Sequence, residues 1–268
     1  MENAINTLSN QLSAFNDLGE LPKKKQIMHH HKNLSNKVMG VLCGRTGCGK
    51  SYLMFKILTT PNFLDYNNLI IYTTTQEQPI YQFLKHGLDL NLKKEAIWKL
   101  FQMFEENDED VNVQLLCEHV ALKHPDLIAN EKDRISVLLT DDMGELSDPS
   151  RLPKGKKNCV LFDDCIMNKD QTIQKTYFTK GRHANCSCFY LTQSFYSLDG
   201  SIIRRNANIF MLFELNNRNV TELLKDLSIP DKDMFKQTCK TIWSKPFSYI
   251  TINLDKPPSN RIIENIFE

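Results

Sequence analysis

The stretch from Gly44 to Ser51, Gly-Arg-Thr-Gly-Cys-Gly-Lys-Ser, restricts the fold of this chain more than any other feature. It matches the pattern GxxxxGK[ST]. The apolar run from Val38 to Cys43 precedes it and predicts a buried strand, and residues 50–60 predict a helix that ends at Pro61. A strand, a glycine-rich turn and a helix in this order are the context that the pattern requires.

This turn has the chemistry of a phosphate site. Glycines let successive backbone N–H groups face one anion, and the following helix presents its positive N-terminal end to the same anion. Lys50 would bring its ammonium group to the β- and γ-phosphates, and the Ser51 hydroxyl would ligate Mg²⁺. A glycine-rich turn with no ligand is the alternative. The predicted binding residues for ATP are Gly44, Arg45, Thr46, Gly47, Cys48, Gly49, Lys50 and Ser51.

A nucleoside triphosphatase also needs an acid at the end of a neighbouring buried strand. Two apolar runs end in paired aspartates, one at Asp141 and Asp142 and the other at Asp163 and Asp164. We favour the second pair, because its run is apolar up to the acid and because a helix, an arginine and a strand follow it in order. Asp163 would then hold the metal, and Asp164 would orient or deprotonate the attacking water. The first pair would be a strand end or turn.

Two further polar residues are candidates for contact with the γ-phosphate. Gln193 is the last residue of the predicted strand that begins at Cys188, and it is a sensor candidate. Arg182 lies just before that strand and is an arginine-finger candidate, because a planar guanidinium supplied by an adjacent subunit makes hydrolysis depend on assembly. Arg204 and Arg205 are reserves, and a structural ion pair is the alternative for each arginine.

Strands that alternate with helices predict an α/β fold with a mostly parallel sheet covered on both faces. We expect the three-layer sandwich of P-loop NTPases, with an additional strand between the phosphate-loop strand and the acid strand. Residues 1–37 would form an N-terminal arm, 38–255 the ATPase domain with a helical insert at about 77–134, and 256–268 a C-terminal tail. Further predicted strands are 68–75, 135–140, 159–162, 188–193, 208–215 and 247–254, and further predicted helices are 169–180, 219–227 and 231–239.

Composition excludes several classes of protein. The net charge of +1 argues against a histone-like nucleic-acid binder, although a few local basic residues can still contact DNA. No apolar stretch approaches the roughly 20 residues of a transmembrane helix, and the polar N-terminus lacks the pattern of a secretory signal. The eight cysteines form no CxxC pair, so neither a zinc site nor a disulfide framework is predicted. We therefore expect a reducing, intracellular location, and we interpret His29, His30 and His31 as a solvated loop in preference to a metal tract.

Taken together, these motifs resemble the FtsK/HerA superfamily of P-loop motors, and within it the poxvirus-type genome-packaging ATPases of large DNA viruses, virophages and related transposons. The resemblance covers about residues 38–215. It depends on a double-aspartate motif, a Gly-Arg-His before the sensor strand and an arginine-asparagine pair after it. The stretches are Leu161-Phe162-Asp163-Asp164, Gly181-Arg182-His183, Tyr190-Leu191-Thr192-Gln193-Ser194 and Ile203-Arg204-Arg205-Asn206-Ala207-Asn208.

The resemblance implies a pentameric or hexameric ring that hydrolyses ATP with Mg²⁺ and drives double-stranded DNA into a preformed capsid. It also implies capsid or portal partners, no membrane, and a location in the host cytoplasm or nucleus where virions assemble, or with the virion. Two other functions stay open. One is a nucleotide-dependent assembly or transposition-partner ATPase. The other is a P-loop nucleotide kinase, although the chain has no arginine-rich cluster that would form a lid.

Overall fold

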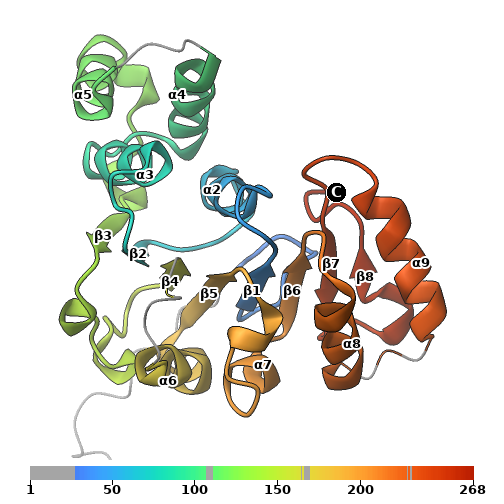
Figure 1. The fold of residues 1–268 in the computed structure, drawn as a ribbon. Helices are drawn as coiled ribbons and strands as arrows, with labels where there is room; N and C mark the ends of the chain where they lie inside the picture. The colour runs from blue at the N-terminus through green and yellow to red at the C-terminus, as the bar shows by residue number, and fades with distance from the viewer. Residues whose placement is uncertain (1–27, 107–110, 164, 166–169, 228, 230) are drawn as a thin grey trace, which may run out of the picture.

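A single mixed sheet organises the computed structural model, which describes residues 28–106, 111–163, 165, 170–227, 229 and 231–268. Its eight strands lie in the order β3-β2-β4-β5-β1-β6-β7-β8 (Figure 1). The first six in this order run parallel, and the pairs β6–β7 and β7–β8 are antiparallel. The strands are Met39–Cys43 (β1), Asn68–Thr73 (β2), Ser136–Thr140 (β3), Asn158–Asp163 (β4), Cys186–Thr192 (β5), Ile209–Leu212 (β6), Ile250–Asn253 (β7) and Ile262–Ile263 (β8).

The strand order confirms the expected α/β sheet with an additional strand. Strand β5 lies between β1, which leads into the glycine-rich loop, and β4, which ends in Asp163. In the register, Cys43 pairs with Thr192, and Phe162 pairs with Tyr190. The carboxyl ends of these three strands therefore meet at one edge of the sheet, where their polar side chains can act together.

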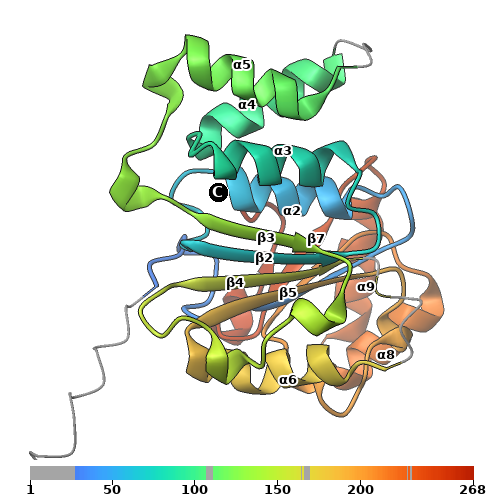
Figure 2. The same cartoon turned by 90° about the vertical axis from the view of Figure 1, so that its left-hand side faces the viewer.

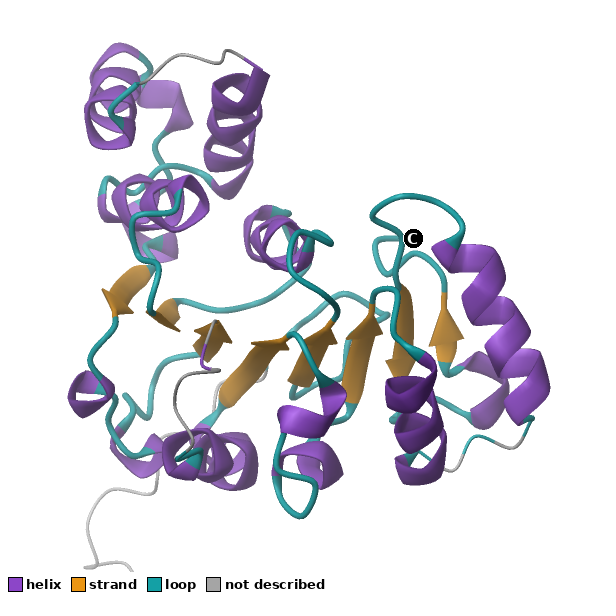
Figure 3. Ribbon diagram, viewed as in Figure 1, coloured by secondary structure: helices purple, strands orange, loops and turns teal. Residues whose placement is uncertain are grey.

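Helices cover both faces of the sheet and complete the three layers (Figures 2 and 3). One face carries α2 and α3, with α4 and α5 beyond them, and the other carries α6 and α8 (Figure 2). The helices are Lys50–Thr59 (α2), Pro79–Asp89 (α3), Lys94–Glu106 (α4), Val113–Lys123 (α5), Thr172–Lys180 (α6), Ile203–Asn206 (α7), Asn217–Asp226 (α8) and Lys232–Trp243 (α9). Among the described residues, no helix combines the length and the apolar character needed to cross a bilayer.

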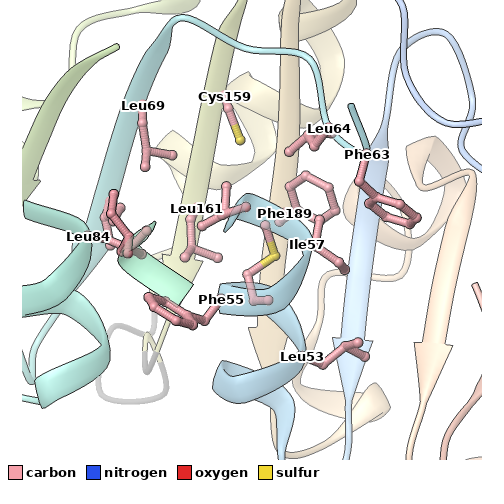
Figure 4. Close-up of a cluster of buried hydrophobic side chains, with 14 of the residues drawn as sticks. Leu53, Phe55, Ile57, Phe63, Leu64, Leu69, Leu84, Cys159, Leu161 and Phe189 are labelled. Carbon is pink, nitrogen blue, oxygen red and sulfur yellow. The ribbon is translucent and has the colours of Figure 1, made fainter. Parts of the chain in front are cut away.

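Each face of the sheet has its own apolar core, because successive side chains of a strand point to opposite faces. In β1, Leu42 belongs to the core under α2, whereas Val41 belongs to the core under α6 to α9. The first core brings together Ile57 of α2, Leu161 of β4 and Phe189 of β5 (Figure 4). Strands β1, β4 and β5 are buried along their whole length, as the central strands of a parallel sheet are.

The connection from β2 to β3 contains α3, α4 and α5 and two 3₁₀ turns. Helix α3 packs against both α4 and α5, and α4 also reaches α2. An isolated bridge between Leu92 and Ile128 closes the base of this connection. Helix α3 thus lies against β3 on the α2 side of the sheet, and α4 and α5 lie beyond it (Figure 1).

The structure corrects the interpretation of the histidines. His30 is not solvated: its Nδ1 accepts a hydrogen bond from the backbone N–H of Asp65 at 3.0 Å, and its Nε2 lies 3.3 Å from the Ser187 hydroxyl. The His31 ring stacks on Phe63 with 5.0 Å between ring centroids. These two side chains therefore fasten the segment before β1 to the domain.

The last predicted strand and the chain beyond it differ from the sequence prediction. The last predicted strand begins at Ile250 and not at Phe247, because Phe247 has a φ of 57° and a left-handed residue cannot continue a strand. The chain beyond residue 255, expected to form a tail, contributes β8 to the sheet and buries Ile266 completely.

Candidate functional site

The glycine-rich loop joins the end of β1 to the start of α2. Gly47 and Gly49 have φ values of 74° and 99°, which strain any residue with a side chain. Helix α2 has no side-chain cap and no acid in its first turn. Its first backbone N–H groups are thus directed at the loop without a side-chain acceptor, which is the arrangement of a helix N-terminus that binds an anion. The fold is the P-loop nucleoside-triphosphatase fold that the sequence predicts.

Lys50 and Cys48 are two ionisable residues of this loop. The Lys50 ammonium donates hydrogen bonds to the carbonyl oxygens of Gly44 at 2.7 Å and of Arg45 at 2.9 Å. Burial raises the pKa of the Cys48 thiol, and the nearby Lys50 only partly opposes this effect. The thiol is therefore neutral at physiological pH, and it places no negative charge beside a bound phosphate.

Ser51 and Asp163 meet although they lie 112 positions apart in the sequence. The Ser51 hydroxyl donates to Oδ2 of Asp163 at 3.1 Å. Both groups offer hard oxygen donors, and two protein donors suit Mg²⁺, which usually keeps several waters and takes phosphate oxygens as well. Within the part of the chain that the structure describes, no group of three or more His, Cys, Asp or Glu could hold a metal by itself. The donors present therefore fit Mg²⁺ bound together with a phosphate better than a metal caged by protein alone.

Gln193 also lies at the cavity that contains Ser51 and Asp163, because it follows directly after β5. A cavity of about 360 Å³ lies over the ends of β1, β4 and β5, within the range of small-molecule sites. It is lined by Thr46, Gly47, Gly49, Lys50, Ser51, Tyr52, Gln78, Asp163, Leu191, Thr192 and Gln193.

The competing acids lie elsewhere. Asp141 and Asp142 follow β3, the edge strand, with β2 between it and β4. The Asp142 carboxylate accepts a hydrogen bond from the backbone N–H of Gly144 at 2.7 Å, so it caps a short turn. Asp164, the predicted general base, lies outside the described residues.

The predicted arginine finger is not in the cavity of its own subunit. Arg182 lies before β5, at the amino ends of the parallel strands, and its guanidinium donates to the carbonyl oxygen of Asn206 at 2.9 Å. The carbonyl of Arg182 in turn accepts from the Lys37 ammonium at 2.5 Å. The length of β5 therefore separates Arg182 from Gln193, and any contact with a nucleotide would be with that of another copy.

The two reserve arginines behave differently from each other. Arg204 forms an ion pair with Asp226 at 2.9 Å, and its guanidinium lies over the ring of Phe195 at 5.0 Å from the centroid. Arg204 is therefore a structural ion-pair residue, which was the alternative to an arginine finger. Arg205 is exposed.

Sequence reasoning missed Tyr81 and Gln78, two residues that form hydrogen bonds at the site. Tyr81 in α3 is buried and donates its hydroxyl to Oδ2 of Asp163, the same oxygen that Ser51 contacts. Gln78 precedes α3, lines the cavity and donates its amide to the Thr75 hydroxyl at 2.8 Å. Neither belongs to a recognisable motif. Both lie in the stretch interpreted as a helical insert, so no sequence signal marked them.

Comparisons with known proteins find solved structures that are similar to this chain at low sequence identity. No family model and no curated protein matches the chain. It is similar to the genome packaging NTPase B204 of Sulfolobus turreted icosahedral virus 2 in complex with AMP, with 15% identity over 87% of this chain and 100% of that chain and a TM-score of 0.49. It is also similar to VirB4 of Thermoanaerobacter pseudethanolicus, with 10% identity over 83% of this chain and 87% of that chain and a TM-score of 0.45. At this level of similarity, the functional conclusion depends on the site itself.

Proposed function

We propose that this chain is a packaging ATPase, which binds ATP with Mg²⁺ at the loop 44–51 and hydrolyses the terminal phosphoanhydride bond. The observation that carries the proposal is the hydrogen bond of 3.1 Å between Ser51 and Asp163. It joins the phosphate loop to the acid of β4 in one cavity, beside Lys50 and Gln193. An ATPase needs these groups together, whereas a structural turn does not.

Each residue has a role that follows from its chemistry. Lys50 and the N–H groups of the loop offset the charge of the phosphate oxygens, and Ser51 and Asp163 would hold Mg²⁺, which adds positive charge at the same oxygens. The Gln193 amide would contact the γ-phosphate as a sensor, and Asp164 would orient the attacking water or accept its proton. Water would be the acceptor of the phosphoryl group.

We also propose that this ATPase translocates double-stranded DNA. This part of the proposal depends on the sequence resemblance and on the position of Arg182. An arginine at the amino edge of the sheet can reach a nucleotide only in a neighbouring copy, so turnover would require assembly into a ring. Double-stranded DNA and a capsid or portal vertex would be the partners of that ring.

The first experiment measures ATP hydrolysis against protein concentration, with and without double-stranded DNA. We expect a steep rise in specific activity with concentration, stimulation by DNA, and a loss of about 100-fold or more in a Lys50→Ala variant. Lys99→Ala, an exposed lysine on α4, is the matched control and should retain activity. Turnover unaffected by dilution and DNA would favour a nucleotide-dependent assembly switch, and transfer of phosphate to a nucleoside would favour a kinase.

An experiment that mixes two inactive variants tests whether Arg182 acts at the nucleotide site of a neighbouring copy. Lys50→Ala and Arg182→Ala proteins should each be inactive, and Arg182→Ala should still bind ATP. When the two are mixed, an intact Lys50 site can lie next to an intact Arg182, so part of the activity should return. If Arg182→Ala hydrolyses ATP normally, or if mixing restores nothing, the arginine has no role in a neighbouring site.

A further inference from the structure

A second cavity borders the glycine-rich loop on the side away from Asp163. Its volume is about 440 Å³, which also falls in the range of small-molecule sites. Gly47 lines both cavities, so they meet at the loop. The second cavity is lined by Arg45, Gly47, Cys48, Phe213, Glu214, Trp243, Ser244, Lys245, Pro246, Phe247 and Ser248.

Because of the strand order, the two cavities would contact different parts of a bound nucleotide. Asp163 ends β4 and Gln193 follows β5, and both strands lie on one side of β1. Phe213 follows β6, on the other side of β1. A triphosphate whose terminal group is beside Asp163 must extend past the loop with its nucleoside at the other end. That end falls at the second cavity.

Phe247 is an unusual residue at the mouth of this cavity. Its side chain is 73% exposed, so the fold gains little from burying the ring. Its φ of 57° is costly for a residue with a bulky side chain, and such backbone strain is concentrated at functional sites. A Cβ atom built on Gly49 would lie 3.6 Å from Cδ1 of Phe247, so this exposed ring lies against the phosphate loop.

The other walls of the cavity are held in place. Phe213 is buried, and the Trp243 indole N–H donates to the carbonyl oxygen of Leu212 at 3.0 Å. At the rim, the Arg45 guanidinium lies 3.7 Å from the Glu214 carboxylate. The site therefore combines fixed apolar walls, one exposed aromatic ring and a polar rim, which are the features of a pocket for a flat heterocycle.

We propose that the purine base of ATP occupies this second cavity and stacks on the ring of Phe247. The proposal rests on the proposed function, because it extends a nucleotide whose phosphates are bound by the loop 44–51. Stacking of a base on an aromatic side chain requires only a π-face, so the ring adds affinity for the nucleoside and none for the phosphates. Phe247 is accordingly a specificity residue that separates nucleotides from inorganic polyphosphates.

Measuring the binding of ATP and of inorganic tripolyphosphate to Phe247 variants tests the proposal. We expect Phe247→Gly to weaken binding of ATP roughly tenfold, while binding of inorganic tripolyphosphate stays unchanged. Phe247→Trp should retain the wild-type affinity for ATP, since indole also stacks. Met234→Ala, an exposed apolar residue on α9 that does not line the cavity, is the control and should change neither affinity.

The Phe247→Gly variant also separates a binding role from a structural role. Glycine adopts a positive φ without strain, so the variant should unfold at the same temperature as wild type or higher. A lower unfolding temperature together with an equal loss of both ligands would show that Phe247 supports the loop, and it would overturn the proposal. Unchanged ATP affinity would also overturn it.

Fluorescence of Trp243 provides a second measurement. In a Trp98→Phe background Trp243 is the single tryptophan, because the chain has two. ATP should change its emission, and tripolyphosphate should not. If the wild type binds tripolyphosphate but ATP leaves the Trp243 emission unchanged, the proposal that the base occupies the second cavity is wrong, whereas the proposed phosphate site at the loop 44–51 is retained. If the wild type binds neither probe, the proposed function fails and this inference fails with it.

Discussion

Oδ2 of Asp163 accepts hydrogen bonds from two hydroxyl groups that come from different elements. Ser51 belongs to the first turn of α2, and Tyr81 belongs to α3. Tyr81 is 1% exposed, so water cannot replace its hydrogen bond easily. A buried donor of this kind fixes the orientation of a carboxylate and thereby tunes its affinity for a metal. Tyr81 is therefore a positioning residue for the Mg²⁺ site that we propose.

At this scale we predict that Tyr81→Phe raises the Mg²⁺ concentration needed for half-maximal ATP hydrolysis by about tenfold, because groups that orient metal ligands have effects of that size. Binding of ATP in the presence of EDTA should not change. The matched control is Tyr66→Phe, which removes a buried hydrogen bond to the carbonyl oxygen of Leu58 far from Asp163. An unchanged Mg²⁺ requirement in Tyr81→Phe would refute the positioning role.

At the scale of elements, β1 and β5 approach each other closely at one glycine. A Cβ atom on Gly40 would lie 2.6 Å from Cδ1 of Phe189, a ring that is completely buried. The strand that leads into the phosphate loop therefore lacks a side chain where its neighbour carries a large one. This close fit fixes β5, and with it Gln193, beside the loop.

We predict that Gly40→Ala lowers the free energy of unfolding by about 1–3 kcal/mol, since an extra methyl group in a packed core forces its neighbours to shift. Urea denaturation measures this value. Gly155→Ala is the control, because a Cβ there meets no atom within 4 Å, and its stability should stay close to wild type. Phe189→Leu added to Gly40→Ala should restore part of the loss, and strictly additive effects would contradict the contact.

At the scale of the whole molecule, the segment before β1 is fastened to the domain through His30. Its ring lies between the backbone of Asp65 and the hydroxyl of Ser187 in β5. The pKa of His30 is lowered to about 4, chiefly by burial and also by the charges of Lys157, Lys94 and His29, while Asp65 acts in the opposite direction. His30 is therefore neutral in the folded protein at pH 7, and it accepts a hydrogen bond that its protonated form could not accept.

This histidine makes stability depend on pH. The unfolded chain takes up the proton near the ordinary pKa of 6.5, and the folded chain takes it up only near 4. Stability from His30 is therefore complete above pH 6.5 and is lost as the pH falls toward 4, by roughly 3 kcal/mol at most. His30→Asn should flatten the dependence of the unfolding free energy between pH 7 and 5, and the same change at the exposed His119 should not. An equal slope in wild type and His30→Asn would count against this account.

The sequence by itself determined the phosphate loop and the alternation of strands and helices. These follow from local patterns: glycines at positive φ, apolar runs of strand length and a helix start after the loop. Only the tertiary structure decided which acid meets Ser51 and showed that Tyr81 donates a hydrogen bond to that acid. It also placed Arg182 at the amino ends of the parallel strands, away from the phosphate loop, and Phe247 beside that loop. These are contacts between distant segments, and the packing of the sheet and its helices creates them without any local pattern in the chain.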